Sequence, residues 1–359
     1  MALLFIEGFE PYGGSVAEMT KGAYLDTTNI SFSTFSRTGT YSLVTAGVQN
    51  AQVRRSLYGE YTTLGMGFAF YITEYPVEST TARLCEFNND NNSPQVSVWI
   101  TTAGNISIGR GAADVGQSYT EFARTTNSPC ITDAWQHVEI QIHFHDTAGW
   151  FEIRLDGITV LQGSNLDTLY STTYQNCNQV NGMGTRAVIS GGSMNWQQYM
   201  DDWYVYDMTG SENNNWIGDR RVLALVPVDN GGTQEWTPNG ASTEYQCIDE
   251  IPADDDTTYI SAGPSGLPIN STFQLTQLGS DVASINGIEI YTKSKKSDAG
   301  VCNLQVSMQQ GSDEATGEIW PASTAYTHRT QMFELDPSTG ALWTPAGLNS
   351  ALVDIERTA

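Results

Sequence analysis

Alternating apolar and polar positions are clearest between residues 134 and 162, where two runs face each other across a turn. Period-two alternation of this length predicts two half-buried antiparallel strands, joined by a turn over residues 146–149. Asp156 and Gly157 then form a second tight turn into a short strand over residues 158–160. The apolar positions of the two runs are Val138, Ile140, Ile142 and Phe144, followed by Phe151, Ile153 and Leu155. The resulting meander has one apolar face, which a second sheet must cover.

The rest of the chain repeats this strand-and-turn pattern and shows no long helical period. Strands are predicted before residue 210 over 3–6, 41–44, 62–72, 82–87, 95–101, 105–110, 188–190 and 200–206. Residues 163–185 are rich in Ser, Thr and Asn and are predicted to be loop. Further strands are predicted over 222–228, 273–278, 285–292, 302–308, 331–335 and 352–355, with short helices over 242–247 and 345–351. The chain is therefore expected to be all-β.

A polar turn cluster near residues 208–219 separates the two groups of strands. We place the domain boundary there, with a β-sandwich over residues 1–212 and a smaller, mainly-β domain over residues 213–359. Both have ordinary domain sizes.

The first domain resembles the concanavalin A-like lectin and laminin-G sandwich. The resemblance rests on the order Trp135, alternating strand, turn with Gly149, alternating strand, Asp156-Gly157 and short strand. It implies a jelly-roll fold and often glycan binding. A fold alone does not fix a function.

A second resemblance starts at the end of this domain, over residues 201–222. Asp201-Asp202-Trp203, the Asp-Met-Thr-Gly of residues 207–210 and the Gly-Asp-Arg-Arg-Val of residues 218–222 are similar to a junction in structural proteins of tailed bacteriophages. The sequences Trp-Thr-Pro at 236–238 and 343–345 fit the same group. This resemblance implies a virion-associated protein without known catalysis.

Composition narrows the classes of partner. Charged residues make up 16% of the chain and the net charge is −24. Both domains are acidic, so neither a nucleic-acid backbone nor an anionic membrane is an expected partner. Five cysteines without a Cys-x-x-Cys spacing indicate neither a zinc site nor a complete disulfide framework.

The N-terminal residues lack a basic region and a long apolar run, so no secretory signal is expected, and no stretch is long enough to insert in a membrane. Synthesis in a host cytoplasm followed by incorporation into a virion fits these features. Other virion proteins would then be partners, and a homo-oligomer, with a trimer favoured, would suit repeated copies on a particle.

Two acidic groups are candidates for calcium, since calcium prefers carboxylate and carbonyl oxygens near strand ends. The first is Asp201 and Asp202, of which only one can line a given site because neighbours on a strand face opposite ways. The second is Asp254, Asp255 and Asp256, which match no EF-hand spacing. The alternative for both groups is a paired or solvated acidic loop, and calcium is the only cofactor considered.

Three histidines, His137, His143 and His145, share one face of the 134–145 strand. They suggest either a transition-metal site or a plain polar strand face exposed to solvent, and the second is favoured.

No catalytic set is evident. The Glu-x-Asp-x-x-Glu spacing of sandwich glycosidases and the Gly-x-Ser-x-Gly nucleophile motif are both missing from the sequence. A non-enzymatic protein is therefore expected.

Aromatic rings are the best candidates for contacts with a ligand or partner. Four tryptophans close to Gly, Pro or Asn in predicted loops are expected to be exposed, while Trp99, Trp135 and Trp203 lie in or beside strands and are expected in the core. The four candidates are Trp216, Trp236, Trp320 and Trp343.

The sequence thus predicts a structural component of a tailed-phage virion, as a capsid decoration, fibre or tail protein that can contact host glycans. The alternatives are a carbohydrate-binding module of cellular origin and, less favoured, a glycanase with an unusual acid pair.

Overall fold

A computed structural model describes residues 2–45, 50–77, 80–112, 119–171, 173–187 and 196–359. The chain divides into two compact units. The N-terminal unit comprises Met1–Phe9 and Gly14–Leu223, and the C-terminal unit comprises Glu10–Gly13 and Ala224–Ala359. Along the chain the N-terminal unit ends at Leu223, whereas the predicted boundary is at residue 212.

The first layer of the N-terminal unit is an eight-stranded antiparallel sheet. Its order is β13 (Ile158–Leu166), β12 (Gly149–Leu155), β11 (Gln136–His143), β6 (Thr63–Ile72), β15 (Gln198–Tyr206), β4 (Ser42–Val44) and β3 (Ser31–Ser33), with β1 (Leu3–Glu7) also paired to β15. The predicted meander is confirmed as β11, β12 and β13, because the alternating side chains of β11 and β12 lie opposite one another in register.

The second layer is a seven-stranded antiparallel sheet. Its order is β10 (Thr120–Arg124), β9 (Ile106–Arg110), β8 (Pro94–Ile100), β7 (Thr80–Asn88), β14 (Cys177–Ala187), β5 (Gln52–Tyr61) and β2 (Tyr24–Asp26). The loop predicted over 163–185 is wrong in its second part, where β14 pairs with both β7 and β5. Its Asn and Gly residues hide the alternation that marks other strands. The strand predicted over 188–190 lies outside the described residues.

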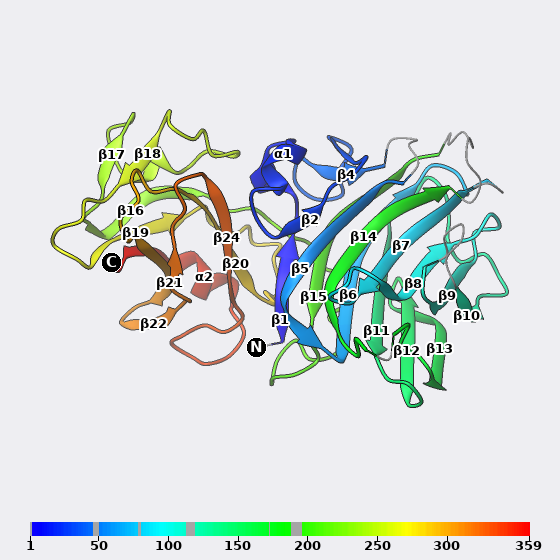
Figure 1. Cartoon of the computed structure of the whole chain (residues 1–359). Coiled ribbons are helices and arrows are strands. Elements are labelled where there is room, and N and C mark those ends of the chain that lie inside the picture. The colour runs from blue at the N-terminus through cyan, green and yellow to red at the C-terminus, as the bar shows by residue number, and fades with distance from the viewer. Residues whose placement is uncertain (1, 46–49, 78–79, 113–118, 172, 188–195) are drawn as a thin grey trace. The chain divides into compact units, whose positions relative to one another are not determined.

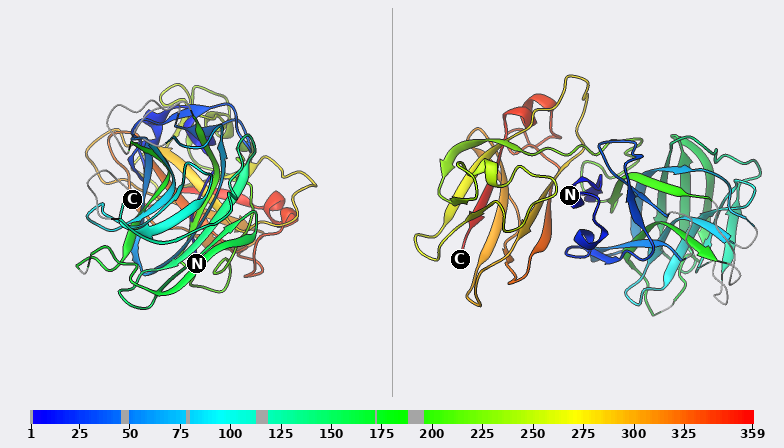
Figure 2. Two further views of the ribbon diagram at one scale, coloured as in Figure 1. Left: turned by 90° about the vertical axis from the view of Figure 1, so that its right-hand side faces the viewer. Right: turned by 90° about the horizontal axis from the view of Figure 1, so that it is seen from above.

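The two sheets face each other in a β-sandwich, as the predicted all-β class requires (Figure 1). Their inner faces bury apolar side chains from both layers, and the turned views show the same two layers (Figure 2). The largest fully buried apolar side chains of this unit include Trp196, Trp203, Phe68, Phe70 and Phe87. Two short helices, η1 (Glu10–Tyr12) and α1 (Val16–Met19), follow β1 in the sequence.

The C-terminal unit is also mainly β. A six-stranded sheet has the order β16 (Pro227–Gln234), β19 (Ile269–Leu275), β25 (Leu352–Arg357), β21 (Asn303–Gln310) and β22 (Asp313–Thr316), with β23 (Trp320–Pro321) also paired to β21. Two-stranded sheets join β17 (Thr237–Asn239) to β18 (Tyr259–Ser261), and β20 (Ile288–Ser294) to β24 (Thr327–Phe333). The predicted helix near residue 345 is α2 (Pro345–Ser350), capped by the Thr344 hydroxyl, and the helix predicted over 242–247 is reduced to η2 (Tyr245–Cys247).

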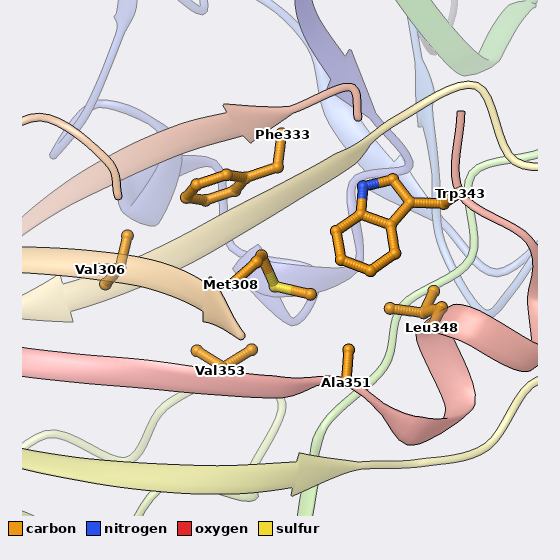
Figure 3. Packing of buried hydrophobic residues seen from close by; sticks show 7 residues of the cluster. All are labelled: Val306, Met308, Phe333, Trp343, Leu348, Ala351 and Val353. Atoms are coloured by element: carbon orange, nitrogen blue, oxygen red, sulfur yellow. The ribbon is translucent and has the colours of Figure 1, made fainter. Parts of the chain in front are cut away.

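The core of the C-terminal unit gathers around Trp343 (Figure 3). Met308 of β21, Phe333 of β24, Leu348 of α2 and Val353 of β25 join it in one cluster from separate elements. This small cluster joins helix α2 to the six-stranded sheet and to the two-stranded sheet of β20 and β24. In the part of the chain that the structure describes, no helix has the length and apolar character needed to cross a bilayer.

Candidate functional site

The outer face of the seven-stranded sheet carries a row of polar side chains that crosses five strands. Asp26 of β2 lies opposite Arg54 of β5, and Arg54 lies opposite Asn181 of β14. Asn181 in turn faces Glu86 of β7, and Glu86 faces Ser97 of β8. We call these five residues the polar row. Because side chains alternate along each strand, the neighbours of these residues point into the sandwich core instead.

The polar row is held by a buried ion pair. Arg83 Nη1 lies 2.7 Å from Glu86 Oε2, and the two side chains are 2% and 3% exposed. Glu86 also accepts hydrogen bonds from Asn181 Nδ2 at 2.9 Å and from Ser97 Oγ at 3.3 Å. Room for the guanidinium comes from Gly184, where a Cβ would lie 2.4 Å from Arg83 Nη2. Gly184 and the ion pair therefore hold the Arg83 guanidinium and the Glu86 carboxylate in place.

Several buried polar atoms on this face lack a hydrogen-bond partner. Among the described residues they include Arg54 Nε, Arg83 Nε, Asn181 Oδ1 and Gln179 Oε1. Arg54 is also partly desolvated, and burial lowers the pKa of its guanidinium. Buried donors and acceptors in native proteins are normally satisfied, so such a concentration marks a surface that a polar ligand or ordered water completes.

A depression of about 210 Å³ lies over the same face. Its lining includes Gln52, Glu86, Asn88 and Asn181, which offer carboxylate and amide groups. Asn181 Nδ2 also lies 3.4 Å from Asn88 Oδ1, which links neighbouring strands. The depression therefore has both hydrogen-bond donors and acceptors on its floor.

An aromatic pair lies beside the polar row. The rings of Trp99 and Tyr119 are 4.2 Å apart, and Trp99 is the register partner of Arg83. The Tyr119 hydroxyl lies 3.2 Å from Ser107 Oγ, and burial raises the pKa of Tyr119. A flat, half-buried ring next to hydrogen-bonding groups suits a ligand with one apolar and one polar side.

Asp201 and Asp202, the first predicted calcium group, hold two loops of the N-terminal unit. Asp201 Oδ2 accepts backbone N–H bonds from Arg37 at 2.8 Å and Thr38 at 3.0 Å. Asp202 Oδ1 accepts from Val222 N at 2.8 Å, and its Oδ2 accepts from the Thr38 hydroxyl at 2.9 Å. Both carboxylates are fully buried and are used by protein donors.

The second predicted calcium group, in the C-terminal unit, lies among hydroxyls and lysines. Asp254 Oδ1 accepts from the backbone and the hydroxyl of Thr258. Asp255 pairs with Lys293, and Asp256 pairs with Lys295 at 2.5 Å. Among the residues the structure describes, no group of three acidic, histidine or cysteine side chains is arranged to hold a metal.

The four candidate tryptophans differ in exposure. Trp216 is half-buried and stacks on Arg154, whose guanidinium carbon lies 3.9 Å from the ring centre. Trp236 is half-buried and donates from Nε1 to Ile355 O at 3.1 Å. Trp320 packs against the C-terminal core and is not an open loop residue.

The expected exposure of Trp343 is wrong. This side chain is 2% exposed and belongs to the core cluster of the C-terminal unit (Figure 3). The Thr-Pro sequence after it starts helix α2, which folds Leu348 back onto the ring.

The expectation of a solvent-exposed histidine face is also wrong for His137, which is 1% exposed. The segment Asn215–Gly218 lies against this face of β11. The neighbouring Glu139 carboxylate accepts hydrogen bonds from Ile217 N at 2.8 Å and from Gly218 N at 3.0 Å. Burial lowers the pKa of His137 to about 4 and raises the pKa of Glu139. His143 and His145 are less buried and line a separate depression of about 380 Å³ with Asp146.

No protein-family model matches the chain, and no curated protein matches it in sequence. Solved structures similar to it include an endo-β-1,4-glucuronan lyase from the fungus Trichoderma reesei, at 18% identity and a TM-score of 0.41, covering 56% of this chain and 94% of that chain. A variant of alginate lyase Aly36B with an alginate trisaccharide has 13% identity and a TM-score of 0.40, covering 56% and 98%. A cellulose-induced protein, Cip1, has 13% identity and a TM-score of 0.38, covering 53% and 88%.

The expectation of a non-enzymatic protein is corrected here, because it rested only on two motifs that are missing from the sequence. The two missing sequence motifs exclude only the chemistries that need them, namely one glycosidase arrangement and one serine nucleophile.

The sequence did not reveal the polar row. Its signal is weak but real: Arg83 and Glu86 place opposite charges inside an otherwise apolar strand segment. A charged pair in a buried strand needs a partner or a ligand.

Proposed function

We propose that the N-terminal unit binds carbohydrate on the outer face of its seven-stranded sheet. The observation that carries this proposal is the polar row with its unpartnered buried atoms beside the Trp99–Tyr119 pair. Saccharides present hydroxyls, which both donate and accept, and apolar ring faces, which stack on aromatic rings.

The direction and length of the polar row suit a chain-like ligand. The row crosses five neighbouring strands, and strands lie about 4.8 Å apart, so it extends over roughly 19 Å. That span accommodates a short oligosaccharide lying across the strands. A polynucleotide is disfavoured, because the net charge of −24 opposes binding of a phosphate backbone.

A matched pair of arginine variants tests the proposal. Arg54→Ala removes a guanidinium from the polar row, while Arg124→Ala removes an exposed one at the edge of the same sheet. On a polysaccharide panel followed by calorimetry, we expect Arg54→Ala to weaken binding about tenfold, or about 1.4 kcal/mol. Arg124→Ala is expected to keep wild-type affinity.

Trp99→Ala is expected to lower the affinity for the same ligand by a similar factor, because the stacking contact is lost. Wild-type protein that binds no member of the panel at millimolar concentration would contradict the proposal, as would equal affinity of the two arginine variants. Reducing ends or unsaturated products measured in the same samples would show turnover of the bound chain.

A second proposal is that the protein is a virion component, with other virion proteins as partners and a trimer as the favoured assembly. The resemblance over residues 201–222 to a junction in structural proteins of tailed bacteriophages supports it. Co-sedimentation of the chain with purified particles tests this role, and light scattering tests the trimer. A monomer that never accompanies particles would contradict it.

A further inference from the structure

Four aromatic rings meet on the outer face of the eight-stranded sheet, on the opposite side of the sandwich from the polar row. Phe35 lies 4.8 Å from Tyr71, 5.1 Å from Tyr199 and 5.8 Å from Trp135, measured between ring centres. Tyr71 also lies 5.8 Å from Trp135 and 5.7 Å from Tyr199. We call these four residues the aromatic platform.

The aromatic platform is built from separate elements of the fold. Tyr71 of β6 and Tyr199 of β15 are register partners, and both alternate with core residues. Phe35 lies between β3 and β4, and Trp135 immediately precedes β11. Phe35 and Trp135 are nearly parallel, with 16° between their planes. The rings are therefore fixed by the sheet and by one another.

These rings remain open to solvent. Phe35 is 44% exposed, and the other three rings are half-buried. Leaving large apolar rings partly in water forgoes the free energy of burying them fully, so a partly exposed group of four is characteristic of a binding surface. Rigid rings also bind at a low cost in conformational entropy.

The polar groups at the edge of the aromatic platform indicate the chemistry of the ligand. The Tyr71 hydroxyl donates to Asp133 Oδ1 at 3.1 Å, and the Tyr199 hydroxyl donates to Gln197 Oε1 at 2.6 Å. Both hydroxyl protons are thus used, and the oxygens at this edge offer acceptors. A ligand with a flat apolar face and hydroxyl donors around it complements this arrangement.

We propose that the aromatic platform is a second saccharide-binding site, specific for a neutral pyranose chain. We expect the ligand to be uncharged, because Asp133 at the edge and the net charge of −24 on the protein repel acidic sugars. The pyranose face stacks on Phe35 and Trp135 while its hydroxyls donate to the surrounding oxygens. This site uses no residue of the polar row, so it stands independently of the function proposed above.

Cellohexaose is the probe, since its rings are uncharged and expose flat C–H faces. Calorimetry is run on wild type, Trp135→Ala, the conservative Trp135→Phe and the control Trp150→Ala, which removes another half-buried indole from the outer face of the same sheet. We expect at least a tenfold loss of affinity in Trp135→Ala. Trp135→Phe and Trp150→Ala are expected to stay within about threefold of wild type, or about 0.7 kcal/mol.

Circular dichroism shows whether each variant is folded, and the binding stoichiometry shows how many cellohexaose sites are occupied. If Trp135→Ala loses its fold, the comparison passes to Asp133→Asn, for which we expect binding of glucuronic acid oligomers to improve relative to cellohexaose. Arg54→Ala must leave platform binding intact, which separates failure here from failure of the polar row. The proposal is overturned if wild type does not bind cellohexaose, if Trp135→Ala binds it equally well, or if light scattering shows that this variant instead abolishes self-association.

Discussion

At the scale of single residues, close approach between strands fixes glycines that a sequence pattern alone does not explain. Tyr204 of β15 lies across β6, and a Cβ on Gly67 would lie 2.2 Å from its ring. The tyrosine is held there, because its hydroxyl donates to Gly218 O at 2.8 Å. The glycine therefore provides the space in which the ring lies.

Gly67→Ala is expected to destabilise the N-terminal unit by about 1–3 kcal/mol, because either the ring or the strand must move. Urea unfolding followed by intrinsic fluorescence measures the change. Gly232→Ala is the control, since a Cβ there meets no atom within 4 Å. Equal stability of Gly67→Ala and wild type would show that Tyr204 moves aside at little cost.

The Arg83–Glu86 ion pair gives a second prediction at this scale. Arg83→Ala leaves Glu86 charged in a site where it is 3% exposed, and breaking a buried pair in this way costs about 3–5 kcal/mol. Arg124→Ala breaks the exposed pair with Glu121, for which about 0–1 kcal/mol is expected. The same urea titration compares the two. Similar losses in both variants would mean that Glu86 is solvated more than its burial indicates.

At the scale of elements, the sequence predicted best where each strand has one apolar face. Val138, Ile140 and Ile142 alternate cleanly, and β11 lies where the pattern places it. The pattern could not show that the other face of β11 is buried as well, because the cover comes from Asn215–Gly218, a segment distant in sequence.

Strand β14 was missed for a related reason. Its outward positions carry Gln179, Asn181 and Gly184, which resemble a loop in composition. Their role depends on Arg83 and Glu86 of β7, which reach them only when the sheet forms. The candidate site was therefore hidden in pairings between strands, whereas the fold class was visible within single strands.

The buried carboxylates of β15 predict a pH dependence. Burial, together with the charge of Asp202, raises the pKa of Asp201 to about 7, against 3.8 for an ordinary Asp. Between about pH 4 and 7 the native state then holds a proton that the unfolded state has released. The contribution of Asp201 to the free energy of unfolding therefore falls as the pH rises through this window. His137, with a lowered pKa, contributes with the opposite sign.

Asp201→Asn isolates the first contribution. Relative to wild type, its free energy of unfolding is expected to rise steadily from pH 4 to pH 7 and then to stay level. Urea titrations at four pH values within and above the window measure this difference. Asp219→Asn is the comparison, because the pKa of Asp219 is lowered and not raised. Parallel curves for Asp201→Asn and wild type would place the Asp201 pKa outside the window.

At the scale of the whole molecule, each unit has its own sheets. In the described part of the chain, β1 to β15 pair only among themselves, and so do β16 to β25. Residues 1–223 are therefore expected to fold alone, with a far-ultraviolet circular dichroism spectrum typical of β-sheet and cooperative unfolding. Aggregation or a non-cooperative transition of this fragment would show that its sandwich needs the C-terminal unit.

The cysteines of the chain can report how often each unit opens. All are free thiols, with Cys85, Cys130 and Cys177 buried in the N-terminal unit and Cys247 buried in the C-terminal unit. Burial raises the pKa of Cys85, Cys130 and Cys177, so a thiol reagent reacts with them only after local or global opening exposes them. The rate at which the four buried sulfurs acquire a label would thus time the opening of each half of the protein separately, without any engineered probe.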